Sequence, residues 1–350
     1  MGCKRVTIED VARAAGVSRQ TVSRAINDQG EISPQTRSRV LRIVEELGYR
    51  PSGIARGLAT HRTRTLGLVV PDVANPFFSD VARGAEQVAY AEGYNVFLCN
   101  TEEDPQRELA VLRSLEGQRV DGVVLCSSRL DDLELRSVVA RHSVVVLVNR
   151  RLESEGEPDR IGVVVLDDVA GGRMAVQHLL DGGHRAVGFL AGPPASRSGR
   201  WRIEGYRAAL TDAGVPGSPA WMVHCPADVD GGHQAAGDLL ALHPELTALC
   251  CYNDLVAVGA LQACVDLGRR VPDDVAVIGF DDIMLAALVT PPLTTCRVPR
   301  YELGAQAMRL LLAQIDDGSD RADKIRPADK LRPCAEVVLQ PELVVRASAP

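Results

Sequence analysis

Nine short apolar runs between residues 65 and 282 restrict the folds that this chain can adopt. They read TLGLVVP, YNVFLC, VDGVVLC, SVVVLVN, IGVVVLD, AVGFLAG, WMVHC, TALCCYND and VAVIGFDD, and helix-length segments such as FSDVARGAEQVAYAEG separate them. Apolar strands joined by crossover helices are typical of parallel sheets that are buried on both faces. Because nine strands exceed a sheet of common size, the pattern predicts an α/β core of two lobes, each with a doubly wound parallel sheet.

Polar residues stand where several of these runs end. Asn149 follows SVVVLV, Asn253 and Asp254 follow TALCCY, and Asp281 and Asp282 follow VAVIGF. In open α/β sheets the ligand crevice lies at the carboxyl ends of the strands. These positions therefore predict a ligand site, with Asp254 and Asp282 as structural caps or supporting groups.

The segment SGRWRIEGY adds arginines to this predicted site, with Arg200 and Arg202 at the start of a helix. Acids, an amide and an arginine offer directional donors and acceptors, which suit a ligand rich in hydroxyls or ring nitrogens. Two alternatives remain at this point. Asn253 and Asp281 could act only as helix N-caps, and Arg202 could be a surface residue.

The first 62 residues differ in charge from the rest of the chain. They carry a net charge of +5, whereas the remainder carries −12. Such asymmetry predicts a polyanionic partner for the basic head alone.

The head contains the start and stop signals of three short helices. Thr7 and Asp10 form a capping-box pattern, and Gly16 is positioned to end the first helix. Ser18 is a suitable N-cap for a second helix, in which Val22, Ala25 and Ile26 face inward. Ser33 and Pro34 begin a third helix, with an apolar stripe of Val40, Ile43, Val44 and Leu47 before Gly48. The order predicts a helix-turn-helix unit.

The outer surface of the predicted second helix is polar. Arg19, Gln20, Thr21, Ser23 and Arg24 remain there when the apolar residues face inward. Arginine can donate two hydrogen bonds to guanine and glutamine can pair with adenine, while hydroxyls bind phosphate. The pattern favours a recognition helix for the DNA major groove, and the alternative is a solvated face of a small helical bundle.

The stretches VTIEDVARAAGVSRQTVSRAIN, ISPQTRSRV and ELGYRPSGIARGLA resemble the DNA-binding headpiece of the lactose and galactose repressor family of bacterial transcription factors. The resemblance implies an all-α headpiece at residues 1–50, a hinge at 51–64 and an effector-binding core at 65–350. It implies that Arg19 and Gln20 read bases of double-stranded operator DNA. The residues that it assigns to DNA binding are Thr7, Ser18, Arg19, Gln20, Thr21, Ser23, Arg24, Asn27, Tyr49, Ala55 and Leu58.

The hinge carries two of these residues. In the family, a leucine from each hinge of a dimer enters the minor groove, and Leu58 matches that position. The alternative is a linker with a chance leucine. Gly57 departs from the pattern, because glycine inside a helix costs about 1 kcal/mol relative to alanine, so we expect this hinge to order less readily.

The core also resembles that family, whose core is similar to periplasmic sugar-binding proteins. NPFFSDVARGAE, RVDGVVL, RWRIEGYRAAL, YNDLVAVGAL and VPDDVAVIGFDDI occur in the family's order. The resemblance implies dimerisation through the core and effector contacts from Phe77 or Phe78, Asn149, Arg202, Asn253 and Asp281. Asn149 departs from the aspartate that often stands there. We expect lobe 1 at about 65–161 and 293–322, and lobe 2 at about 162–292 and 323–345.

Other classes of protein are poorly supported. The chain lacks G-x-G-x-x-G, G-x-x-x-x-G-K-[ST], H-E-x-x-H and G-x-S-x-G, and its seven histidines show no ligand spacing, so neither an enzyme nor a metal site is expected. No CxxC pair occurs among nine cysteines, which predicts buried reduced thiols. With no secretory leader or membrane span, we expect a cytoplasmic protein without a cofactor.

These observations predict a ligand-responsive transcriptional regulator, in which a homodimer binds a pseudo-palindromic operator and a small-molecule effector lies between the lobes. The predicted effector is a sugar, and the protein would then repress a sugar-utilisation operon. The alternative is a purine or another metabolite that acts as a corepressor.

Overall fold

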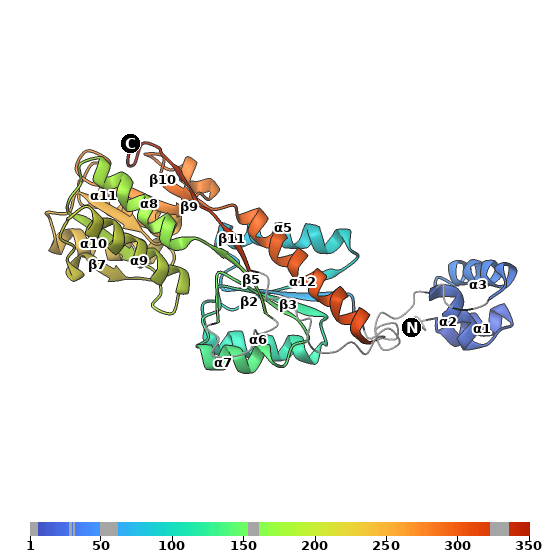
Figure 1. The fold of residues 1–350 in the computed structure, drawn as a ribbon. Coiled ribbons are helices and arrows are strands. Elements are labelled where there is room, and N and C mark those ends of the chain that lie inside the picture. Colours follow the sequence, from blue (N-terminus) through green and yellow to red (C-terminus); the bar gives the residue numbers. More distant parts are fainter. Residues whose placement is uncertain (1–5, 28–29, 31, 50–61, 153–160, 323–335) are drawn as a thin grey trace. The chain divides into compact units, whose positions relative to one another are not determined.

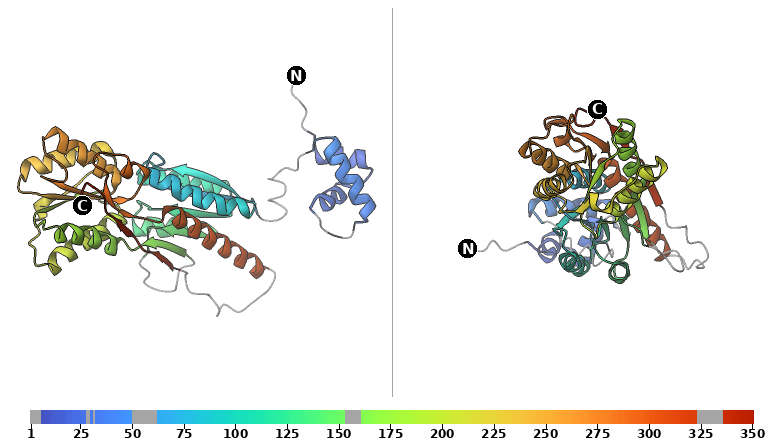
Figure 2. Two further views of the ribbon diagram at one scale, coloured as in Figure 1. Left: turned by 90° about the horizontal axis from the view of Figure 1, so that it is seen from above. Right: turned by 90° about the vertical axis from the view of Figure 1, so that its left-hand side faces the viewer.

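The structure is a computed structural model that describes residues 6–27, 30, 32–49, 62–152, 161–322 and 336–350, without the side chains of 317–322. The chain divides into two compact units, Met1–Thr63 and Arg64–Pro350, whose ribbons are drawn in Figures 1 and 2. The hinge residues Ala55, Gly57 and Leu58 lie outside the described residues, so their predicted roles stay predictions.

The described residues of the first unit form three helices: α1 (Ile8–Ala15), α2 (Arg19–Asn27) and α3 (Pro34–Glu46). Their shared core is small. Val11, Val22 and Val40 have no exposed surface, and Ala25 is 1% exposed. Each helix contributes at least one of these residues, which is why the three short helices can be stable together.

The ends of these helices follow the predicted signals. Thr7 and Asp10 form the capping box, in which the Thr7 backbone N–H donates to Asp10 Oδ2 at 2.9 Å. Gly16 ends α1 with φ +63°, and the Ser33 side chain accepts from the Thr36 N–H. Leu47 was predicted to face inward and is 38% exposed, because α3 ends one residue earlier and Leu47 leaves the apolar stripe.

Two six-stranded sheets form the frame of the second unit (Figure 1). All nine predicted strands are present: β1 (Thr65–Val70), β2 (Asn95–Asn100), β3 (Gly122–Cys126), β4 (Val145–Val148), β5 (Ile161–Leu166), β6 (Val187–Ala191), β7 (Met222–His224), β8 (Ala248–Cys251) and β9 (Ala276–Asp281). Three more strands complete the sheets: β10 (Thr294–Arg297), β11 (Glu336–Leu339) and β12 (Glu342–Val344). The described strands pair in parallel except β10 with β12. Their orders are β11-β5-β4-β3-β1-β2 and β12-β10-β9-β8-β6-β7.

Helices cover both faces of each sheet (Figures 1 and 2). The first sheet packs on α5 (Pro76–Ala91) and α12 (Arg300–Ala322) on one face, and on α6 (Pro105–Gly117) and α7 (Asp132–Val139) on the other. The second packs on α8 (Asp168–Asp181) and α9 (Arg197–Asp212), and on α10 (Val229–Leu242) and α11 (Asp254–Asp266). Two 3-10 helices, η1 (Pro219–Trp221) and η2 (Met284–Ala287), lie in loops. Strand residues alternate between these layers, as Leu68 and Val69 do.

The chain passes between the two lobes three times within its described part, and not where the sequence predicted. It passes from β5 to α8, from β10 to α12 and from β11 to β12. The predicted boundaries 161/162, 292/293 and 322/323 were therefore wrong: β5 and β11 belong to the first sheet and β10 to the second. Apolar strands that are buried on both faces look alike in sequence, and the run TTCR of β10 is not apolar enough to be recognised as a strand. The last strand, β12, joins the second sheet as predicted.

Glycines set the spacing of three helix pairs. A methyl group on Gly84 would overlap the carbonyl oxygen of Tyr301, and one on Gly304 would overlap that of Val81, so α5 and α12 touch backbone to backbone. The same reciprocal contact recurs between α8 and α9 at Gly172 and Gly205, and between α10 and α11 at Gly232 and Gly259. Any larger residue at these positions would push a helix off its sheet.

We expect Gly304→Ala to lower the free energy of unfolding by about 2–3 kcal/mol, because the added methyl group meets rigid backbone. Urea denaturation of the full chain measures the change. Gly237→Ala in α10 is the matched control: no atom lies within 4 Å of its added methyl group, so that variant should be unchanged or up to about 1 kcal/mol more stable. Equal stability of the two variants would contradict the glycine-contact argument.

Candidate functional site

One cavity in the second unit brings the predicted ligand residues together. It has an empty volume of about 360 Å³, including its opening, and all six predicted residues line it. They are Phe77, Phe78, Asn149, Arg202, Asn253 and Asp281. The first three come from the lobe of the first sheet and the others from the second lobe. A molecule bound here would therefore contact both lobes.

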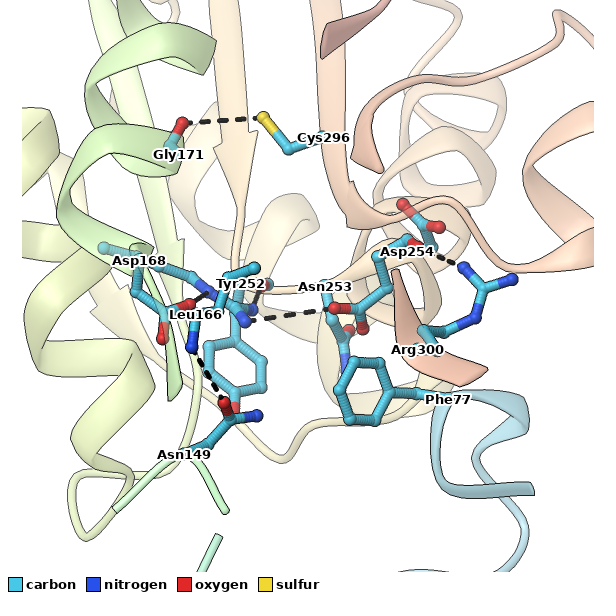
Figure 3. Close-up of polar contacts among 12 residues, drawn as sticks. Phe77, Asn149, Leu166, Asp168, Gly171, Tyr252, Asn253, Asp254, Cys296 and Arg300 are labelled. Carbon is cyan, nitrogen blue, oxygen red and sulfur yellow. Dashed lines mark hydrogen bonds and ion pairs between the residues drawn. The ribbon is translucent and has the colours of Figure 1, made fainter. Parts of the chain in front are cut away.

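The sheet ends position these side chains as the sequence predicted. Asn149 directly follows β4, Asn253 follows β8, and Asp281 is the last residue of β9. Phe77 and Phe78 lie in the first turn of α5, where the Asn75 side chain accepts from the Phe77 N–H, and their rings meet edge to face at 4.9 Å. Figure 3 shows Phe77, Asn149, Tyr252 and Asn253 around one space.

Four of the cavity residues have strained backbone with positive φ: Glu103, Ser127, Asn149 and Asp281. The φ angles of Asn149 and Asp281 are 53° and 113°, in the region that glycine favours. Such conformations cost of order 1–3 kcal/mol each and cluster at functional sites. Asn149 and Asp281 both stand at the carboxyl end of a strand, and both line the cavity.

Arg202 is the charged centre of the cavity wall. Its Nε donates to Asp168 Oδ1 at 2.7 Å, and its Nη1 donates to the carbonyl oxygen of Tyr252 at 2.6 Å. The guanidinium also covers the Phe280 ring, 3.7 Å from the centroid. Arg202 is only 5% exposed, so it is not a surface residue. These contacts hold it rigidly, with Asp281 Oδ1 3.9 Å from its Nη2.

Asp281 is a buried acid that is incompletely compensated. Burial raises its pKa to about 7, although Arg202 and Arg300 favour the charged form. Burial also raises the pKa of Asp168 and of Asp254, and the charge of Asp281 adds to the effect on Asp254. The site therefore holds a proton near neutral pH, and a ligand that donates a hydrogen bond to Asp281 would favour its release.

Asn253 is a helix N-cap and Asp281 is not. Asn253 is the N-cap of α11, because its Oδ1 accepts from the Val256 N–H at 2.8 Å while its Nδ2 donates to the Ala227 carbonyl oxygen. Its side chain lines the cavity as well. Asp281 belongs to a strand, and η2 has Ile283 at its N-cap without a side-chain hydrogen bond.

Asp254 and Asp282 are supporting groups, as predicted. Asp254 accepts from the Ile283 N–H at 2.8 Å and from Thr295 Oγ1 at 2.6 Å. Asp282 accepts from Arg297 and Arg346. These bonds tie the end of β9, where Asp281 lies, to its neighbours and fix the residues that follow it.

Sequence reasoning missed seven residues of the cavity wall: Asn75, Glu103, Ser127, Arg129, Ser198, Ala227 and Tyr252. Ser127 follows β3, so the strand-end argument would have found it. Arg129 pairs with Glu103, donating from Nη2 to Oε1 at 2.9 Å, in loops whose meeting the sequence does not predict. In the sequence, Tyr252 looks like the end of an apolar run. In the structure, its hydroxyl and the Ser196 hydroxyl form a hydrogen bond of 3.0 Å.

In the first unit the predicted DNA-contacting residues lie mainly on or beside α2. Ser18, Arg19, Gln20 and Arg24 are exposed, and Thr21, Ser23 and Asn27 are half-buried, as is Tyr49 beyond α3. The Ser18 side chain caps α2 by accepting from the Thr21 N–H at 3.1 Å. Thr7 lies at the start of α1, where its side chain is part of the capping box. The exposed Arg19 and Arg24 take no part in the Ser18 cap.

The described residues offer little for other chemistry. Seven cysteines are described, all of them free and six of them buried, and burial raises the pKa of Cys126 to about 12. Within those residues no group of three or more His, Cys, Asp or Glu side chains could hold a metal ion. None of the described helices is long and apolar enough to cross a membrane.

Comparisons with known proteins identify both units. Residues 63–332 match the family model of periplasmic binding proteins and the sugar-binding domain of the LacI family, and residues 7–52 match the bacterial regulatory proteins of the lacI family. The chain belongs to the LacI family of bacterial regulatory proteins. It is therefore a DNA-binding transcriptional regulator with an effector-binding domain, as the sequence predicted.

Several LacI-family relatives cover most of the chain. Catabolite control protein A of Priestia megaterium is 37% identical over 87% of this chain and 91% of its own. The HTH-type transcriptional repressor PurR of Photobacterium profundum is 34% identical over 98% of both. Among solved structures, the Lac repressor dimer bound to operator and the anti-inducer ONPF has a TM-score of 0.83 at 28% identity, covering 99% of each chain. The CelR–cellobiose complex has a TM-score of 0.72 at 33% identity, covering 98% of this chain and all of the other.

The raised pKa of Asp281 predicts that the ligand-free protein loses stability as pH rises. Folding favours the protonated acid, so between its ordinary value near 4 and about 7 the native state binds more protons than the unfolded state. We expect this group to cost about 1–3 kcal/mol between pH 5 and pH 8, measured by urea denaturation.

Asp281→Asn should make this dependence shallower, while the part that comes from the raised pKa values of Asp168 and Asp254 should remain. Asp274→Asn is the control, because Arg270 holds the pKa of that exposed carboxyl at about 2 and it stays charged throughout the range. If the stability of the Asp281→Asn variant falls with pH as steeply as that of the wild type, other groups cause the pH dependence.

Proposed function

We propose that this LacI-family protein is a homodimeric repressor whose affinity for a pseudo-palindromic operator is controlled by a small molecule bound in the cavity between its lobes. One observation carries the proposal: a cavity with walls from both lobes occurs in a chain that also carries a lacI-type DNA-binding domain. A ligand that touches both lobes changes the free energy of their relative orientation, which is what a switch requires. The Lac repressor relative is itself a dimer on operator.

The proposed DNA contacts come from the predicted residues. The exposed positions of Arg19 and Gln20 at the start of α2 support base contacts in the major groove, and the exposed Arg24 supports a phosphate contact. The charge of +5 over residues 1–62 supports a large electrostatic share of the binding energy. Two heads in a dimer would contact two half-sites.

A sugar is the effector class that the cavity supports best. Nine of its thirteen lining residues are polar or charged, with amides, hydroxyls, carboxylates and guanidinium groups on several sides. That arrangement suits a polyhydroxyl ligand. The aromatic rings of Phe77, Phe78 and Tyr252 favour the second candidate, a purine, as does the likeness to PurR. A regulator of this kind needs no catalytic group, and it acts in the cytoplasm where operator DNA is.

The operator and the effector should change each other's affinity by the same factor. With an operator obtained by binding selection on genomic DNA, effector titrations by calorimetry with and without operator measure it; we expect a ratio of about 5–150. A ratio of one would refute the switch.

Arg19→Ala should weaken operator binding by about 1–3 kcal/mol and relax the base preference at one position of each half-site. A binding selection with the variant measures the preference. Arg13→Ala is the control, since Arg13 is an exposed arginine of α1 that lies on a different helix of the same unit. The same base preference in the Arg19 variant and the wild type would exclude base recognition by Arg19.

A further inference from the structure

Two arginines, one from each lobe, pair with the same carboxylate, and a third, exposed arginine interacts with all three groups electrostatically. Arg150 Nη2 lies 2.5 Å from Asp132 Oδ1, and Arg197 Nη2 lies 2.9 Å from the same oxygen. Arg200, on the same helix as Arg197, interacts electrostatically with Arg197, Arg150 and Asp132. Among the described residues the cluster therefore holds three positive charges against one negative charge.

The arginines of the cluster are neighbours in sequence of residues that line the ligand cavity. Arg150 directly follows Asn149, and Ser198 lies between Arg197 and Arg200 in the first turn of α9; both Asn149 and Ser198 line the cavity. Each arginine is thus one or two residues in sequence from a residue that lines the cavity. One guanidinium belongs to the first lobe and two belong to the second.

Arg150 is buried without full compensation. Its side chain is 1% exposed, and its Nε has no hydrogen-bond partner within the described part of the chain. Its other nitrogens reach Asp132 and the carbonyl oxygens of Leu130 and Arg151. A buried N–H that lacks an acceptor costs of order 1–3 kcal/mol, more when the group is charged. An additional anion would satisfy it.

The start of α9 adds to the positive potential. This 16-residue helix has no acidic residue in its first turn, where Arg197 and Arg200 lie instead. Helix N-termini carry a partial positive charge and favour anions. Arginines at this end are therefore repelled by the positive end of the helix dipole as well as by each other. Burial and the charge of Arg197 lower the pKa of Arg150, and the same two causes lower that of Arg200, which agrees with an excess of positive charge.

We propose that Arg150, Arg197 and Arg200 bind an anionic group of the effector, a phosphate or a carboxylate, and that Asp132 occupies this place in the ligand-free protein. The effector is then a sugar derivative that carries a negative charge, with its hydroxyls in the cavity. This inference rests on the proposed function and narrows its ligand class. Because Asp132 and the anion compete for the same guanidinium groups, removing Asp132 must strengthen anion binding.

Inorganic phosphate tests the anion site without knowledge of the effector. Calorimetric titration of the full chain at constant ionic strength, balanced with sodium chloride, measures its affinity. We expect the double variant R197Q/R200Q to bind phosphate about tenfold or more weakly. R207Q is the control, because Arg207 is an exposed arginine two turns further along the same helix.

Asp132→Asn separates a binding site from a purely structural ion pair. It should bind phosphate about fivefold or more tightly than the wild type, because the internal competitor is neutral. A structural role alone would leave phosphate binding unchanged or weaken it. Wild-type protein that fails to bind phosphate, or Asp132→Asn protein that binds it no better, would overturn the anion site.

The effector's charge is tested with the probe nearest to the natural ligand, a deproteinised metabolite extract of the source cells divided by anion exchange. The retained fraction should change operator affinity, and activity confined to the unretained fraction would overturn the anionic effector. Glucose 6-phosphate, glucuronate and glucose, titrated in parallel, distinguish phosphate from carboxylate and from no charge. If neither fraction acts, the proposed effector control fails, whereas the phosphate titration still decides the anion site.

Discussion

Backbone contact between paired helices is the constraint on which the core depends. At three places a helix lies so close to its neighbour that only hydrogen fits between them, and each contact is made by a glycine on both sides. The contact between α8 and α9 also serves the ligand site. Gly172 touches the backbone of Arg202, so the same close approach that packs the two helices brings the guanidinium to Asp168 at the start of α8.

The ligand site concentrates features that oppose stability. Asp281 is buried, has a strained backbone and keeps an elevated pKa, and Arg150, which follows the cavity residue Asn149 in sequence, has a buried N–H without a partner among the described residues. Apolar residues at these places would give a more stable core. The hydrophobic cores on both faces of each sheet supply stability that offsets these features. A ligand that forms hydrogen bonds with these groups removes their energetic cost, and this gain adds to the free energy of ligand binding.

Much of the fold follows from patterns that are local in sequence. Strand-length apolar runs predicted nine strands, and the rule for strand ends placed Asn149, Asn253 and Asp281 at one site. The points at which the chain crosses between the lobes could not be predicted from the sequence. The sheet that a strand joins depends on pairing between distant segments. For the same reason the sequence did not predict the ion pair between Glu103 and Arg129 or the position of Tyr252 in the cavity wall. Leu47 shows a smaller limit, because one residue at a helix end changes the face on which a side chain lies.

The three crossings also have a consequence for synthesis on the ribosome. Neither lobe is a continuous stretch of chain, and β5 waits for β11, its neighbour in the first sheet, until residues 336–339 have been made. During that time the nascent protein has an open strand edge, and such edges bind chaperones or other chains. A chain that terminates before residue 336 completes neither sheet, because β11 and β12 follow all the other described strands. Only a chain that has been translated through β11 and β12 can therefore form both complete sheets.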